Sequence, residues 1–189
     1  MMKKIWMLVL LPLFLQAEKL PLEGRQFGVE FNIPRLLTYS EDWKSASGAF
    51  SYFDHTNKVE IAFPWLISKT NDSGERDTYL DVNTIDVHYR KFLGEELNGF
   101  YFSGIGRLAH LDGKLREENA YQKTLKFGLG VGLGYRLFPK TNRFYWGTGL
   151  VVGRYISSEN DIYAHGIDFN FDDQSFFVDL EFLKFGYAF

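Results

Sequence analysis

The chain contains no cysteine, so neither a disulfide framework nor a lipid-modified cysteine is available to it. The apolar run from Ile5 to Leu15 is too short for a membrane-spanning helix, which needs roughly 20 residues. Basic residues are in the minority, with 21 lysines and arginines against 24 acidic residues. This charge balance argues against a nucleic-acid partner.

The N-terminus has the layout of a secretory signal peptide. Lys3 and Lys4 precede the apolar run, and Ala17 follows it. A positively charged start, a short apolar centre and a small residue at the cleavage point are the three parts of such a leader. We therefore expect residues 1–17 to be a signal peptide and residues 18–189 to form a single domain; a retained N-terminal anchor is the alternative.

The chain is rich in aromatic residues (18%) and has 18 glycines, yet its mean hydropathy is only −0.20. Low hydropathy fits a membrane protein in which only every second residue faces lipid. Large apolar residues occupy the odd positions from Leu125 to Tyr135, whereas Lys126, Arg136 and four glycines occupy the even ones. Seven further segments show related alternation: 24–37, 47–54, 58–68, 79–93, 99–111, 143–156 and 183–189.

The connections between these segments alternate in length. Long polar stretches follow the first, third, fifth and seventh segments, whereas short turns follow the second, fourth and sixth. Membrane barrels with short periplasmic turns and long external loops produce this rhythm and an even strand number. We therefore predict an all-β fold, an eight-stranded antiparallel up-and-down transmembrane β-barrel, with both chain ends on the periplasmic side.

The last five residues, FGYAF, place Phe185, Tyr187 and Phe189 at alternate positions. This ending resembles the C-terminal signal read by the barrel-assembly machinery, although Lys184 stands where that signal commonly has a glycine. Together with the eight segments, it makes the chain resemble the small eight-stranded outer-membrane barrels of Gram-negative bacteria, the class of the OmpA transmembrane domain, OmpX, OmpW and PagL. The resemblance implies a monomer in the cell outer membrane that contacts outer-membrane lipid and lipopolysaccharide, with these three aromatic residues as its assembly signal.

A soluble, lipocalin-like barrel with an apolar interior is the alternative architecture. It would place the six large apolar residues between Leu125 and Tyr135 in one small cavity. The four glycines on the opposite face suit a crowded interior better, which favours the membrane barrel.

The faces opposite the apolar ones carry charges of both signs, which we expect to fill the barrel interior as ion pairs and leave no continuous aqueous channel. A proton or ion path is the functional alternative. The residues assigned to this interior network are Glu30, Glu60, Asp86, His88, Arg90, Arg107, Lys126, Arg136 and Lys184.

Two motifs that could bind a cofactor or metal are weak. The stretch GLGVGLG fails the dinucleotide-binding spacing, because the third glycine position counted from Gly128 falls on Leu133. The stretch DFNFDD begins at Asp168 like a calcium loop, but Asp173 stands where that loop requires glycine. We expect neither a cofactor nor a metal.

Two classes of function stay open. The protein acts through external loops, such as Glu159 to Gln174, or as a structural membrane component; alternatively, it is a lipid-modifying enzyme, similar to a lipid A deacylase or acyltransferase, or a conduit for small apolar molecules. No histidine of the chain has a serine two positions away, the arrangement that deacylases of this class use. His110 is the only histidine expected on the outer surface of a strand, and we expect no deacylase activity.

Overall fold

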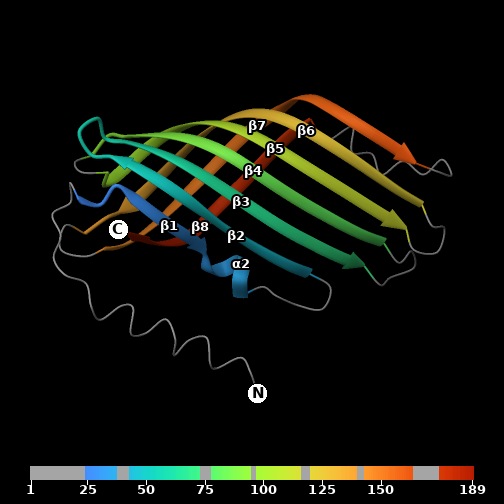
Figure 1. The fold of residues 1–189 in the computed structure, drawn as a ribbon, viewed down its shortest axis with the longest axis horizontal. Helices are drawn as coiled ribbons and strands as arrows, with labels where there is room; N and C mark the ends of the chain where they lie inside the picture. The colour runs from blue at the N-terminus through green and yellow to red at the C-terminus, as the bar shows by residue number, and fades with distance from the viewer. Residues whose placement is uncertain are drawn as a thin grey trace, which may run out of the picture.

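The chain forms a closed barrel of eight antiparallel strands, in which each strand pairs with its neighbours in sequence and β1 pairs with β8 (Figure 1). This confirms the predicted all-β, up-and-down architecture. The computed structural model describes residues 24–37, 43–72, 78–94, 97–115, 120–139, 143–163 and 175–189, so the expected signal peptide lies outside it. The elements are β1 (Phe27–Asn32), α2 (Ile33–Leu37), β2 (Trp43–Asp54), β3 (Val59–Asp72), β4 (Thr78–Phe92), β5 (Gly99–Leu115), β6 (Ala120–Leu137), β7 (Phe144–Tyr163) and β8 (Phe176–Ala188).

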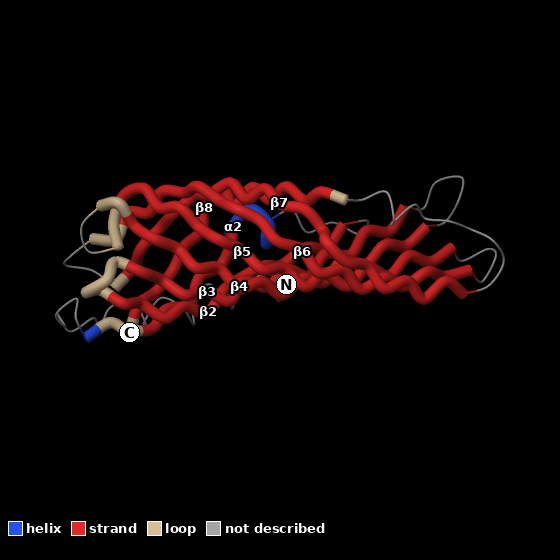
Figure 2. The backbone as a smooth tube through the Cα atoms, turned by 90° about the horizontal axis from the view of Figure 1, so that it is seen from above, coloured by secondary structure: helices blue, strands red, loops and turns tan. Residues whose placement is uncertain are grey.

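Strands β3 to β7 are longer than the sequence indicated. They contain 14, 15, 17, 18 and 20 residues, so parts of the expected external loops are strand. Polar residues continue the ladders: Lys69 lies opposite Asp81 at 3.3 Å, and Asp112 lies opposite Lys123. Backbone pairing needs no apolar side chain, and opposite charges facing each other across a ladder support it. The long strands therefore project well beyond the end of β1 (Figures 1 and 2).

The first strand is shorter than predicted. It ends at Asn32, and the chain turns into the short helix α2, so Ile33 is helical rather than part of the strand. Pro34 fits the first turn of a helix, where no backbone N–H is needed, and the Asn32 side chain accepts a hydrogen bond from the Arg35 N–H at 3.4 Å. Among the described residues, no helix is long and apolar enough to cross a membrane.

Alternation along the strands separates an apolar outer face from a polar lumen. On β4, Ile85, Val87 and Tyr89 are 64%, 48% and 54% exposed, whereas the intervening Asp86 and His88 are 2% and 1% exposed. The same division holds on β6, where the odd positions face outward. Charged side chains are therefore gathered inside the barrel, and large apolar side chains cover its outside.

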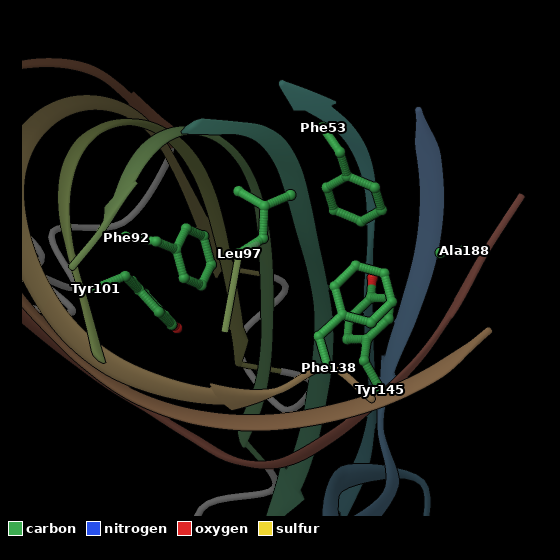
Figure 3. Packing of buried hydrophobic residues seen from close by; sticks show 7 residues of the cluster. All are labelled: Phe53, Phe92, Leu97, Tyr101, Phe138, Tyr145 and Ala188. Atoms are coloured by element: carbon green, nitrogen blue, oxygen red, sulfur yellow. The ribbon is translucent and has the colours of Figure 1, made fainter. Parts of the chain in front are cut away.

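The lumen is closed by aromatic side chains near one end. This end, where β2 meets β3, β4 meets β5 and β6 meets β7, is called here the turn end. The ring centroids of Phe138 and Tyr145 are 5.2 Å apart, and those of Phe92 and Tyr101 are 5.0 Å apart. Figure 3 shows these rings inside the barrel wall. The buried cluster consists of Phe53, Phe92, Leu97, Tyr101, Phe138, Tyr145 and Ala188.

Glycines on β6 and β7 provide the space for interior rings. A Cβ atom added at Gly128 would lie 2.8 Å from the Phe177 ring, and one added at Gly153 would overlap the same ring. A Cβ atom added at Gly134 would likewise overlap the ring of Tyr101. The glycine-rich face of β6 is thus the place where large rings from other strands are accommodated.

The last strand contains an irregularity that changes which residues face inward. Leu183 has a φ of 49°, and the register between β7 and β8 shifts between Gly147 and Gly149. As a result, Phe182 and Leu183 both face outward, and Glu181 and Lys184 both face the lumen. Such bulges re-aim the side chains on either side of them.

Candidate functional site

Four charged side chains from β1, β3, β4 and β6 meet near the turn end of the lumen. The guanidinium of Arg90 lies 3.1 Å from Glu30 and 3.1 Å from Glu60. Arg136 lies 2.7 Å from the other carboxylate oxygen of Glu60 and 3.5 Å from Glu30. Each of these side chains is 2% exposed or less. The two carboxylates are therefore shared between two arginines.

Strand β8 adds two charges to this group. The ammonium of Lys184 lies 2.6 Å from Glu181 and 3.6 Å from Glu30. Glu181 is in turn 3.5 Å from Arg90. The resulting turn-end cluster contains three carboxylates and three cationic side chains: Glu30, Glu60, Glu181, Arg90, Arg136 and Lys184.

A second group, called here the mid-barrel cluster, consists of Asp86, Arg107, Asp179 and Arg35. Arg107 binds Asp86 through two nitrogens, at 2.9 Å and 2.6 Å, and lies 3.1 Å from Asp179. Arg35 of helix α2 forms an ion pair with the other oxygen of Asp179. His88 lies between the two clusters, 3.3 Å from Asp86 and 3.5 Å from Arg90.

Aromatic rings cover the cations of both clusters. The guanidinium carbon of Arg107 lies 4.4 Å from the ring centroid of Phe177, and that of Arg136 lies 4.5 Å from the ring centroid of Tyr145. Cations stacked on ring faces gain further electrostatic attraction in a site with little water. Ion pairs and rings together fill the lumen from the turn end to its middle.

The structure brings together eight of the nine residues assigned to the interior network from the sequence. Lys126 is also buried in the lumen, where its ammonium lies 5.4 Å from the Tyr155 ring centroid; it is not among the residues that define the two clusters. Sequence reasoning missed Arg35, Asp179 and Glu181. The alternation of Asp179 and Glu181 with apolar neighbours in VDLEF was the available signal.

A small cavity of about 30 Å³ adjoins both clusters. Its lining includes Glu30, Asp179 and Glu181 from the lumen and Arg35 from α2. The lining also includes residues of β2 and β3, the strands that follow the helix in sequence. The charged lumen is thus connected to the part of the wall beside α2.

The described residues include no arrangement typical of an acyl-transfer enzyme. His110 lies on the outer side of β5 and is opposite Asn83 of β4 and Leu125 of β6, so neither facing residue provides a hydroxyl group. Ser103 faces the lumen, together with Arg107. No group of three metal-ligating side chains occurs within the part of the chain that the structure describes.

Some residues considered in the sequence lie elsewhere. Asp168, Asp173 and His165 are outside the described residues. Glu159, expected in an external loop, belongs to β7, and the remainder of that expected loop after Tyr163 lies outside the described residues as far as residue 174. Phe185 and Phe189 are 49% and 46% exposed on the outside of the barrel.

No family model, curated protein or solved structure matches this chain.

Proposed function

We propose that the protein is an integral outer-membrane β-barrel with a filled lumen, acting through its external end or as a structural component of the membrane. The observation that carries this proposal is the apolar outer face, to which all eight strands contribute. Val131, Val178 and Ile85 are 63%, 71% and 64% exposed, although they belong to three different strands. Monomeric soluble proteins rarely expose contiguous apolar patches of more than a few hundred Å².

The height of the apolar face fits a bilayer. On β6 the outward residues run from Leu125 to Tyr135. Ten steps of about 3.3 Å give about 33 Å along the strand, which a tilt of about 40° reduces to about 25 Å. Apolar bands of transmembrane barrels are about 25 Å tall.

Aromatic residues form a belt around the turn end. The ring centroids of Phe100 and Tyr135 are 5.1 Å apart, and those of Tyr135 and Trp146 are 6.4 Å apart. Phe27 and Phe189 continue the belt across the β1–β8 seam at 6.4 Å. Such girdles mark the membrane–water boundary of transmembrane barrels, because the rings favour the interfacial region.

An outward-facing charge at mid-height provides the test. Val131 and Leu93 are almost equally exposed, at 63% and 62%, but Val131 lies near the middle of the apolar face and Leu93 lies next to the turn end, directly after β4. The protein is refolded into phosphatidylcholine vesicles, and the free energy of unfolding is measured by urea titration. Val131→Arg should lower it by about 2 to 4 kcal/mol and Leu93→Arg by about 0 to 1 kcal/mol.

A barrel whose outer face is exposed to water would tolerate both substitutions. Arginine at either exposed position would then leave the free energy of unfolding within about 0.5 kcal/mol of the parent value. Equal, small effects at both positions would therefore contradict the proposed membrane location.

A further inference from the structure

The barrel wall is interrupted beside helix α2. Residues 43–47 of β2 pair with β3 alone, because β1 reaches β2 only from Gly48 to Tyr52. On the other side, β8 pairs with β1 only from Lys184 onward, so Phe176–Glu181 pair with β7 alone. Among the residues that the structure describes, no strand joins these two segments, so the hydrogen-bonded wall has a break between them.

Helix α2 lies at this break. It contacts both β2 and β8, and it follows β1 directly, as Figure 1 shows. The ion pair between Arg35 and Asp179 links the helix to β8. A five-residue helix has little stability of its own, so the contacts of Arg35 are important for holding it in place.

The cavity at the break is lined from both faces of the wall. Phe31 and Trp65, which are 46% and 37% exposed on the outer face, contribute to it. Asp179 and Glu181, which face the lumen, contribute as well. At about 30 Å³ the cavity holds only about one water molecule, so a larger group can reach the charged interior from the apolar surface only when α2 is displaced.

The charges of the mid-barrel cluster determine which head group fits. Asp86 and Asp179 are balanced by Arg107 and Arg35. The turn-end cluster is balanced within itself, with three carboxylates and three cations. If Arg35 left with the helix, Asp179 would keep only its ion pair with Arg107, which it shares with Asp86, and the cluster would favour another cation in the place of Arg35.

We propose that the break between β2 and β8 is a lateral binding site for a cationic amphiphile, an alkylammonium with an apolar chain. Its N–H donors take the position of the Arg35 guanidinium at Asp179, and its chain lies outward past Phe31 and Trp65. The inference rests on the proposed membrane location, because that is where such a chain would be dissolved.

Two single-tryptophan variants test the site. Trp65 and Trp146 are both on the outer face and both 37% exposed, but only Trp65 lines the break. W6F/W43F/W146F retains Trp65 alone, and W6F/W43F/W65F retains Trp146 alone. Each is refolded into phosphatidylcholine vesicles, its folded state is checked by heat-dependent gel migration, and its fluorescence is titrated with chain-brominated dodecylammonium or chain-brominated dodecyl sulfate.

The proposal predicts saturable quenching of Trp65 by dodecylammonium, reversed by the unbrominated amine, and weak, non-saturating quenching of Trp146. Arg35→Gln should lower the half-saturating concentration about tenfold, because a competing charged hydrogen bond is removed, whereas Arg35→Lys should change it little. Asp179→Asn should abolish the preference for the amine over the sulfate.

Equal quenching of the two tryptophans, or a preference for dodecyl sulfate, would overturn the lateral site. If Asp179→Asn fails to fold, the comparison of Arg35→Gln with Arg35→Lys still decides the question. A chain that does not insert into vesicles at all contradicts the membrane location instead, so the two failures are distinguishable.

Discussion

The side chain of Arg90 on β4 reaches across the lumen to Glu30 on β1, with 3.1 Å between Nη1 and Oε1. The two strands are not neighbours in the sheet, since β1 pairs only with β2 and β8. Glu60 lies opposite Arg90 on the adjacent strand and binds the same nitrogen at 3.1 Å. One arginine thus connects separate parts of the wall through the middle of the barrel.

Loss of the Arg90 side chain should destabilise the barrel strongly. Arg90→Ala leaves Glu30 and Glu60 buried with fewer cationic partners, and breaking a buried ion pair in this way costs about 3 to 5 kcal/mol. The free energy of unfolding from urea titration measures the effect. Lys69→Ala is the control, because the Lys69–Asp81 pair is exposed and should contribute at most about 1 kcal/mol. Similar losses for both variants would contradict a stabilising role for the buried network.

The filled lumen should not conduct ions. Purified protein in planar lipid bilayers is expected to show no stepwise conductance of the porin type, because ion pairs and the aromatic cluster around Tyr145 occupy the interior. The same recordings on Tyr145→Ala, which removes one ring of this cluster, show how the conductance responds when the interior is less filled. Regular conductance steps from the unmodified chain would show that the lumen is open.

Space for the interior rings depends on the absence of side chains at particular glycines. Gly153→Ala would force a Cβ atom into the Phe177 ring and to within 2.6 Å of the Leu129 backbone oxygen, and we expect a loss of about 1 to 3 kcal/mol in the free energy of unfolding. Gly106→Ala is the matched control, since a Cβ atom there meets nothing within 4 Å. Phe177→Leu should reduce the penalty of Gly153→Ala. Equal free energies of unfolding for Gly153→Ala and Gly106→Ala would show that the Phe177 ring does not need the space at Gly153.

The C-terminal residue should matter for assembly in the cell. Phe189 exchanges two backbone hydrogen bonds with Phe27, at 3.1 Å and 2.8 Å, and we propose that it is also part of the assembly signal. Deleting Phe189 should leave unassembled protein in the periplasm, detected by loss of heat-modifiable gel migration, while refolding in detergent is impaired less. Leu180→Ala, on the outer face of the same strand, is the control. Equal assembly of the truncated and full chains would exclude the signal.

The lipid A of a Gram-negative host should keep its acyl chains when the protein is expressed. His110 has no hydroxyl group at the positions facing it on β4 and β6, and deacylation needs a nucleophile within hydrogen-bond reach of its base. Mass spectrometry of the lipid A provides the measurement. Loss of one acyl chain, abolished by His110→Ala, would make the protein an enzyme.

The sequence predicted those parts of the barrel in which outward-facing and inward-facing residues alternate strictly along a strand. From Leu125 to Arg136, strict alternation separates the two faces, and counting back from Phe189 places Lys184 inside. The same count fails from Phe182 backward, because the irregularity at Leu183 shifts the alternation by one residue and hides the inward direction of Glu181.

Two other features depended on tertiary contacts. Strand ends such as Lys69 looked like loop because polar residues gave no apolar alternation, yet pairing with Asp81 on β4 extends the ladder. The helix at Ile33–Leu37 was hidden within an apolar stretch that also fits a strand, and Arg35 forms an ion pair with Asp179, 144 residues later. Local pattern contains no information about such distant partners.

Fractionation of a Gram-negative host that expresses the full chain tests the central claim most directly. Membranes are separated by density and extracted with urea, and unheated and heated samples are compared by gel electrophoresis. The account predicts protein in the outer-membrane fraction that resists extraction and migrates differently before and after heating. Folded protein recovered in the soluble periplasmic fraction would contradict it.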